Sequence, residues 1–292
     1  MTRNFGFTFG RTPEGNRADY AELEKRLAEQ NAPIVPVTDP IQPINPTPNQ
    51  PQPLAVKVQA NINLDDYVQI GINGLYGKPV VISKFEIKDA NNKNYEDTHK
   101  FVLKQGVYIP TPQIFMTHFQ NVVKAFKERK NKNGSKLLDG KGNIISGNDL
   151  EDLYKHLTKD HIATYGGQAG AWTWLNAGFK NGNLETVMGV NSKGLTKNIV
   201  PLDAYLKEDA YVNFDFNSQG LAKANSKCAN QAYSQGENIY FWQPREGAVA
   251  WFNAGSDRAI LSCSWYPTGS DSSLGVFACA EGAVVAKNGG KK

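Results

Sequence analysis

Residues 248 to about 280 constrain the fold most strongly, because their side chains alternate between a small or apolar set and a chemically mixed set. Phe252 belongs to the small or apolar set, whereas Trp251 and Asn253 belong to the chemically mixed set. The phase shifts by one residue at Arg258, which indicates a turn or bulge. Alternation with a period of two is typical of strands with one buried face. The segment therefore predicts two half-buried strands, with the small or apolar set facing inward.

The same segment has an unusual composition. Residues 247 to 280 contain no Lys, Glu, Gln or Met, although a solvated strand face normally carries such side chains. Randomising the adenines of AAC or AAT codons produces Asn, Asp, Ser, Gly, Tyr, Thr, Ile and Arg, and none of the absent types. Trp251 and Trp265 then need a different template codon, such as AGG. A short sheet of small residues that lacks long side chains by chance is the alternative, and composition alone does not exclude it.

Several fixed positions of this segment resemble a known frame. They resemble the variable-region frame of diversity-generating retroelement variable proteins, particularly archaeal and archaeal-virus members. The matching stretches are Ala248–Ala254, Ala259–Cys263, Pro267 and Ser273–Ala278. The resemblance is strong over the segment, weaker from residue 107, and absent from residues 1 to 106. Phe277 departs from the pattern, because many relatives have Arg there, so contacts made by that Arg are not assumed.

The resemblance implies a C-type lectin-like fold whose exchangeable side chains lie on a rigid, solvent-exposed face while the backbone stays fixed. The positions expected to vary and to bind ligand, called the variable set below, are Trp251, Asn253, Gly255, Asp257, Arg258, Ile260, Ser262, Ser264, Trp265, Tyr266, Thr268, Gly269, Asp271 and Ser273. The positions expected to face inward and hold the backbone, called the frame, are Phe252, Ala254, Ser256, Ala259, Leu261, Cys263, Pro267, Ser270, Leu274, Gly275, Val276 and Phe277.

Two details of the segment carry further expectations. Trp265 and Tyr266 lie between fixed positions, and rigid aromatic side chains give large contact area at low entropic cost, so they are the expected hot spot. A core pair is the alternative interpretation. Cys263 falls on the inward face, so its thiol is expected to be buried and unreactive.

The rest of the chain predicts an α+β layout in four parts. Residues 1–30 form an N-terminal arm with a short helix at Asn16–Glu29, and residues 31–54 form a linker whose closely spaced prolines block helix and sheet. Residues 55–106 predict a small β unit. Residues 107–292 predict the lectin-like ligand-binding domain, with its variable region at about 248–280.

The expected elements follow from periodicity. In the β unit, strands are expected at 56–64, 68–72 and 80–87, with a hairpin at Asn73-Gly74 and a fourth strand at 100–108. In the second domain, one helix opens at Thr111-Pro112 and another near residues 146–148. Short, mainly antiparallel strands follow, with candidates at 171–175, 211–216 and 238–242. Two helices followed by many short strands are typical of α+β proteins.

No catalytic or metal-binding constellation emerges, so the chain is not expected to be an enzyme or to hold a cofactor or metal. The three cysteines, Cys228, Cys263 and Cys279, lack the CxxC spacing of a zinc site, and their odd number argues against a disulfide framework. A single disulfide bridge between two of them is left open. His156 and His161 have the wrong spacing for two ligands on one helical face, and they are interpreted as surface histidines at a helix end. The glycine-rich run 166–170 lacks the Lys and Ser/Thr of a phosphate loop.

Composition also narrows the partners. A net charge of +4 is too small to indicate nucleic-acid binding. The N-terminus lacks the apolar core of a signal peptide, and no apolar run suits a membrane helix, so no membrane insertion is expected. The predicted function is binding of a protein or glycan ligand, for instance during attachment to a host cell, from a virion or cell surface. The alternatives are a structural virion or surface protein, and an enzyme of the formylglycine-generating, sulfatase-modifying type. The oligomeric state is left open.

Overall fold

The computed structural model describes residues 62–87, 89–130, 137–159, 161 and 170–282 of the chain. These residues all belong to one compact unit, Gln52–Lys292. The expected N-terminal helix, the proline-rich linker, most of the first predicted strand and residues 166–169 of the glycine-rich run lie outside the described residues.

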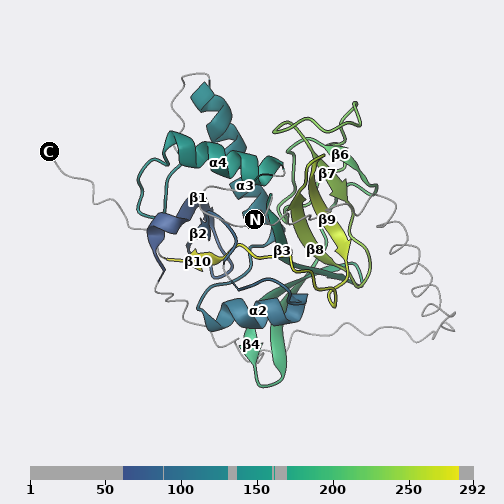
Figure 1. The fold of residues 1–292 in the computed structure, drawn as a ribbon. Helices are drawn as coiled ribbons and strands as arrows, with labels where there is room; N and C mark the ends of the chain where they lie inside the picture. Colours follow the sequence, from purple (N-terminus) through teal and green to yellow (C-terminus); the bar gives the residue numbers. More distant parts are fainter. Residues whose placement is uncertain (1–61, 88, 131–136, 160, 162–169, 283–292) are drawn as a thin grey trace, which may run out of the picture. The chain divides into compact units, whose positions relative to one another are not determined.

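The described fold is mixed α and β, as the sequence predicts, and it is built on two sheets (Figure 1). The larger sheet has seven strands in the order β5-β4-β3-β8-β9-β7-β6. Neighbouring strands are antiparallel, except that β7 runs parallel to β9. Its strands are β3 (Trp172–Lys180), β4 (Asn183–Asn191), β5 (Gly194–Pro201), β6 (Ala210–Val212), β7 (Ile239–Trp242), β8 (Val249–Ala254) and β9 (Ala259–Trp265).

The smaller sheet joins distant parts of the sequence. It contains β1 (Tyr67–Asn73), β2 (Pro79–Ser83) and β10 (Cys279–Glu281), in the order β1-β2-β10. The hairpin predicted after Asn73 connects β1 and β2. Strand β2 corresponds to the strand predicted at 80–87, and it ends earlier than predicted, at Ser83. There the Ser83 hydroxyl donates to the Phe85 carbonyl. Leu64–Asp66 form a short 3-10 helix, η1, so the end of the first predicted strand was wrong.

The fourth strand predicted for residues 100–108 was also wrong, because α2 (Tyr95–Lys104) occupies most of it. The Asn94 side chain caps this helix by accepting from the Asp97 amide at 2.8 Å. The buried residues of α2 are Tyr95, Thr98, His99, Val102 and Leu103, a helical spacing that begins before the apolar run mistaken for a strand. Only Tyr108, beyond the helix, makes an isolated β-bridge, to Cys279.

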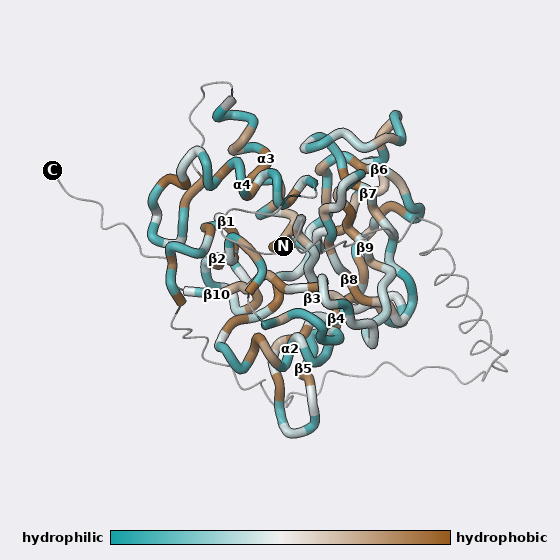
Figure 2. The backbone as a smooth tube through the Cα atoms, viewed as in Figure 1, coloured by the Kyte–Doolittle hydropathy of each residue, from teal (hydrophilic) through white to brown (hydrophobic). Residues whose placement is uncertain are grey.

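The two helices predicted for the second domain are confirmed as α3 (Pro112–Lys130) and α4 (Gly147–Thr158). The hydroxyl of Thr111 accepts from the Ile114 amide at 3.2 Å, and the hydroxyl of Ser146 accepts from the Asp149 amide. The apolar residues spaced along one face of α3 are all buried: Ile114, Phe115, Phe119, Val122, Val123 and Phe126. The Phe115 ring lies 4.8 Å from that of Phe252. Helix α3 therefore packs on one face of the large sheet. Figure 2 shows hydrophobic residues along the central strands and hydrophilic residues in the peripheral turns.

Candidate ligand-binding surface

The two strands predicted for the C-terminal segment are β8 and β9, which form an antiparallel hairpin. The register pairs Trp251 with Ser262, Phe252 with Leu261, and Asn253 with Ile260. A tight turn joins the strands, with the Gly255 amide donating to the Arg258 carbonyl at 2.9 Å. The phase shift at Arg258 is therefore a turn.

The frame forms the inner side of this hairpin and of the segment after it. Its buried members are Phe252, Ala254, Ala259, Leu261, Cys263, Leu274, Gly275, Val276 and Phe277. Phe277, where relatives carry Arg, packs against Phe115 at 5.3 Å between ring centroids. Ser256, Pro267 and Ser270 are exposed, so their predicted inward orientation was wrong. They lie in turns, where the alternation of a strand does not hold.

Most of the variable set lies at the surface. The half-buried or exposed members are Asn253, Gly255, Asp257, Arg258, Ile260, Trp265, Tyr266, Thr268, Gly269, Asp271 and Ser273. Three members are buried, against the expectation of an outward face: Trp251, Ser262 and Ser264. Ser262 lies between Trp251 on β8 and Trp242 on β7 in the register of the sheet. Large neighbours therefore shield a small residue, even on the outer face.

Tryptophans form the centre of this surface. The Trp251 ring lies 5.7 Å from Trp172 and 5.1 Å from Trp265, and Trp265 also contacts Tyr266. The indole nitrogens of Trp251 and Trp265 are buried and have no hydrogen-bond partner among the described residues. Part of the predicted hot spot is therefore used for packing. Trp265 packs against Trp251, and the rest of the Trp265 side chain is accessible.

The loop after β9 is held to the segment before α2 mainly through its backbone. The Pro267 carbonyl accepts from the Tyr95 amide, and the Asp271 carbonyl accepts from the Asn92 amide, both at 3.1 Å. The Ser272 carbonyl accepts from the Asn91 side chain at 2.9 Å. Since carbonyl groups make these bonds, the path of the loop depends little on which side chains it carries.

Asp271 is the exception in the loop. Its carboxylate accepts from the Ser273 amide at 2.7 Å, a turn that stabilises the backbone locally. Asn, Ser and Thr can make the same kind of bond, so Asp271 can change within a polar group of residues without loss of the turn.

Behind the surface lies a buried polar contact that sequence reasoning missed. Glu86 accepts from the Trp172 amide at 3.0 Å and lies 2.9 Å from His156 of α4. Burial alone would lower the pKa of His156, but the Glu86 carboxylate, the His161 carbonyl and the charge of Asp152 together outweigh it, so the pKa is raised. His156 is fully buried, so its interpretation as a surface histidine was wrong. Its position three residues after the buried Leu153 was the signal that placed it inward.

The predicted state of Cys263 is confirmed. All three cysteines are free, and Cys263 and Cys279 are fully buried. Burial raises the pKa of both thiols well above the usual range. A thiol with a raised pKa is protonated at neutral pH and is a poor nucleophile. The bridge that the sequence left open is not formed.

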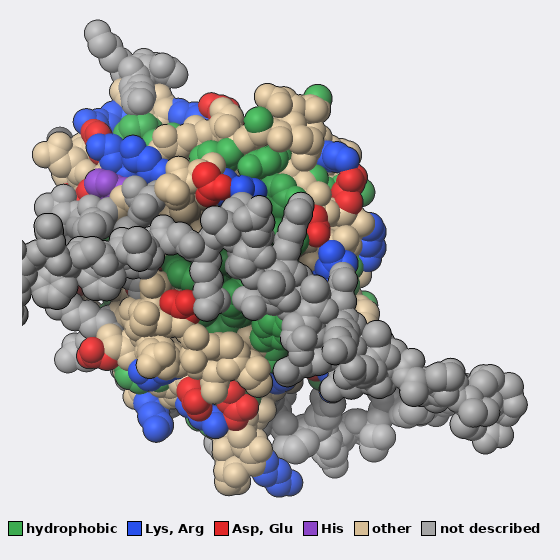
Figure 3. Space-filling model, turned by 45° about the vertical axis from the view of Figure 1, so that its right-hand side comes forward, with side chains coloured by type: hydrophobic (Ala, Val, Ile, Leu, Met, Phe, Trp, Pro, Cys, Tyr) green, Lys and Arg blue, Asp and Glu red, His purple; other side chains and the backbone are tan. Residues whose placement is uncertain are grey.

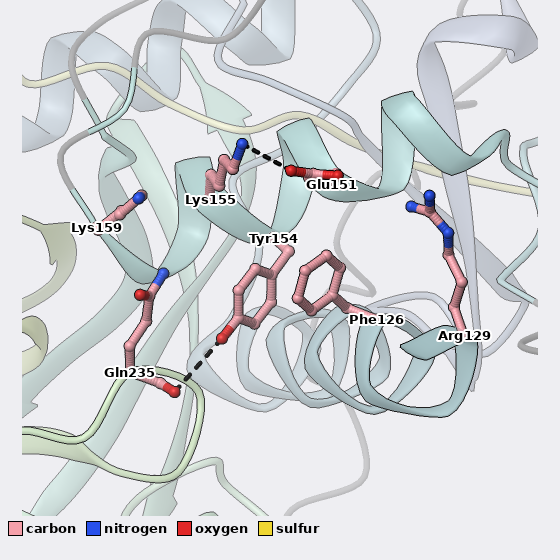
Figure 4. Close-up of a pocket in the computed structure, with 7 residues that line it drawn as sticks. All are labelled: Phe126, Arg129, Glu151, Tyr154, Lys155, Lys159 and Gln235. Atoms are coloured by element: carbon pink, nitrogen blue, oxygen red, sulfur yellow. Dashed lines mark hydrogen bonds and ion pairs between the residues drawn. The ribbon is translucent and has the colours of Figure 1, made fainter. Parts of the chain in front are cut away.

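A cavity of about 460 Å³ lies elsewhere, between α3 and α4 (Figure 4), and no member of the variable set lines it. The rings of Phe126 and Tyr154 stack in its wall, 3.9 Å apart. Glu151 and Lys155 form an ion pair at 2.7 Å, and Arg129 donates to the Gly147 carbonyl. These charged groups already have partners, so the cavity offers weaker grounds for a binding site than the hairpin surface does.

Within the described ranges, no three His, Cys, Asp or Glu side chains gather as a metal site would require. None of the helices described is both long and apolar enough to cross a membrane. No family model, curated protein or solved structure matches the chain.

Proposed function

We propose that this chain is a ligand-binding protein with a C-type lectin-like version of the α+β fold, whose C-terminal surface is diversified by a retroelement. One observation carries the proposal: the frame and the variable set separate in space. The strand residues of the frame are buried, with Phe252 packed on Phe115 of α3, whereas most of the variable set is accessible. A surface that is rewritten in sequence needs a backbone that does not depend on the rewritten side chains.

The proposed partner is a protein or glycan ligand, met during attachment to a host cell, with this chain displayed on a virion or cell surface. The enzyme alternative needs reactive cysteines or a metal site. The burial and raised pKa of Cys263 and Cys279 weigh against the first of these.

The gene itself provides the test. A near-identical repeat and a reverse transcriptase gene are expected close by. Differences between gene and repeat should fall in codons of the variable set and at adenines of the repeat. Differences spread equally over frame codons such as those of Phe252 and Leu261, or differences at other bases, would contradict the proposal.

A further inference from the structure

The register of the large sheet places residues outside the variable set on the same surface. Asn253 of β8 pairs with Ile260 of β9, and Ile260 pairs in turn with Tyr240 of β7. Tyr240 pairs with Tyr211 of β6, and on the other side Asn253 pairs with Trp172 of β3. Paired residues on neighbouring strands point to the same face. These side chains therefore form one row across five adjacent strands, called the cross-strand row below.

The cross-strand row is accessible along its whole length. Each of its side chains is half-buried, and none is enclosed. Strands lie about 4.8 Å apart, so the row spans on the order of 19 Å. Of its five residues, only Ile260 and Asn253 belong to the variable set. Three aromatic residues from strands before residue 248 extend the surface on both sides.

Direct contacts join these constant aromatics to each other and to the variable set. The rings of Tyr211 and Tyr240 meet edge to face at 4.8 Å, and Tyr240 meets Trp242 at 5.5 Å. The Arg258 guanidinium lies over the Tyr240 ring, 5.6 Å from its centroid. The aromatic side chains are thus held in place by packing, which lowers the entropy lost when a partner binds.

The charges around the row indicate the kind of partner. Arg258 pairs with Asp257 at 2.6 Å, and Arg245 pairs with Asp209 at 3.1 Å. The flanking charges are balanced, so the surface does not select an anionic polymer. Figure 3 shows hydrophobic side chains among acidic and basic ones on the side where β6 to β9 lie. Tyr, Trp and Arg on a rigid and nearly neutral face are the residues enriched at protein–protein hot spots.

We infer that the binding surface extends beyond the variable set to Trp172, Tyr240 and Tyr211, and that it takes a folded protein partner. The constant aromatics provide contact area that every partner shares, while Asn253, Ile260 and Arg258 between them determine which partner binds. The inference rests on the proposed function, because it deepens the same site.

A library test separates the two claims. The accessible members of the variable set other than Trp265 are randomised to the products of AAC codons in the full chain, while the buried Trp251, Ser262 and Ser264 are kept. Binders are then selected against lysozyme as a folded protein probe. Several independent binders are then combined with Tyr240→Ala, Tyr211→Ala or Trp172→Ala. The matched control is Tyr76→Ala, because Tyr76 is a half-buried tyrosine in the β1–β2 hairpin, outside the row. Thermal unfolding verifies that each variant is folded.

Substitution in the row is expected to weaken lysozyme binding about tenfold or more in most binders, with less than about a twofold change for the control. Binders whose affinity survives all three row substitutions would overturn the inference and leave the proposed function standing. A folded library without any binders would count against the proposed function itself. Binders obtained against maltohexaose and never against lysozyme would overturn the partner class. Dimerisation of the unaltered chain that Tyr240→Ala abolishes would identify a second copy as the occupant.

Discussion

The Oε2 atom of Glu86 and the Nε2 atom of His156 lie 2.9 Å apart in the interior, joining the segment after β2 to helix α4. Neither side chain is more than 5% exposed. The other carboxylate oxygen of Glu86 accepts from the Trp172 amide, and its side chain lies against Gly275 of the frame. One buried carboxylate thus positions the start of β3 and the frame behind the variable set.

Glu86→Gln is expected to lower the free energy of unfolding by roughly 3 to 5 kcal/mol near pH 6, because it leaves one member of a buried ion pair without its partner. The pKa of His156 is raised, so the stabilisation from the pair is complete below the unfolded value of about 6.5. It is lost as pH rises through the raised pKa. Urea unfolding of both proteins at pH 6, 7.5 and 9 measures this change.

The control for this prediction is an exposed ion pair. Lys127 and Glu237 lie 2.7 Å apart with substantially exposed side chains. Lys127→Gln is expected to cost less than about 1 kcal/mol at each pH. The interpretation of Glu86 fails when the cost of Glu86→Gln is the same at pH 6 and pH 9.

The buried His118 is expected to destabilise the folded protein in acid. Burial lowers its pKa to about 3, and both ring nitrogens lack a hydrogen-bond partner among the described residues. Between pH 6.5 and 3 the unfolded chain therefore binds a proton that the folded protein excludes, which lowers stability by about 1.4 kcal/mol per pH unit. His118→Leu should remove this slope and leave stability at pH 7.5 equal or higher, because an apolar side chain needs no partner.

His99 gives an independent version of the same experiment. Its pKa is also lowered to about 3, by burial and by the charge of Lys197. Urea unfolding from pH 7.5 to 4 should show a reduced acid slope in His99→Leu as well. Superimposable slopes for the original chain and both variants would mean that these histidines are protonated inside the folded protein.

The sequence predicted the β8–β9 hairpin well, because alternation is a local signal. Phe252 and Leu261 face inward as expected, and the turn lies where the phase changes. The burial of Trp251 and Ser262 could not be predicted in this way. It depends on Trp172 and Trp242, which come from strands placed alongside only by the folded topology.

The two clearest failures differ in their physical origin. Phe101 to Leu103 form an apolar run that suits a strand or a helix, and only the cap at Asn94 and the earlier buried residues decide for the helix. The His156 ring meets the His161 carbonyl at 3.3 Å, but its charged partner lies far away in the sequence. Its partner Glu86 lies 70 residues away, and no local pattern links the two.

Gly170 lies where two backbone segments behind the hairpin approach closely, so a side chain there should not fit. Its φ is +75°, and an added Cβ would lie 1.9 Å from the Ala254 carbonyl oxygen at the end of β8. Gly170→Ala should therefore cost roughly 3 to 5 kcal/mol, from left-handed strain and from overpacking together. Gly182 is the matched control, with φ +71° and open space around its Cβ position. Gly182→Ala should cost about 1 to 2 kcal/mol. Equal costs in urea unfolding would show that strain alone acts at Gly170.

Three consecutive residues of β8 test the division between frame and variable set. Phe252→Ala should cost roughly 3 to 5 kcal/mol, because its ring fills the core against Phe115 and Phe119. Asn253→Ser should change stability by less than about 0.5 kcal/mol, since the side chain is partly exposed. Trp251→Ser should behave like a core change and cost roughly 3 kcal/mol, although Trp251 belongs to the variable set, because only 7% of it is exposed. Urea unfolding of the three variants ranks them. A small cost at Trp251 would mean that Trp172 and Trp265 close over the vacated space, and that this position is free to vary as the coding pattern predicts.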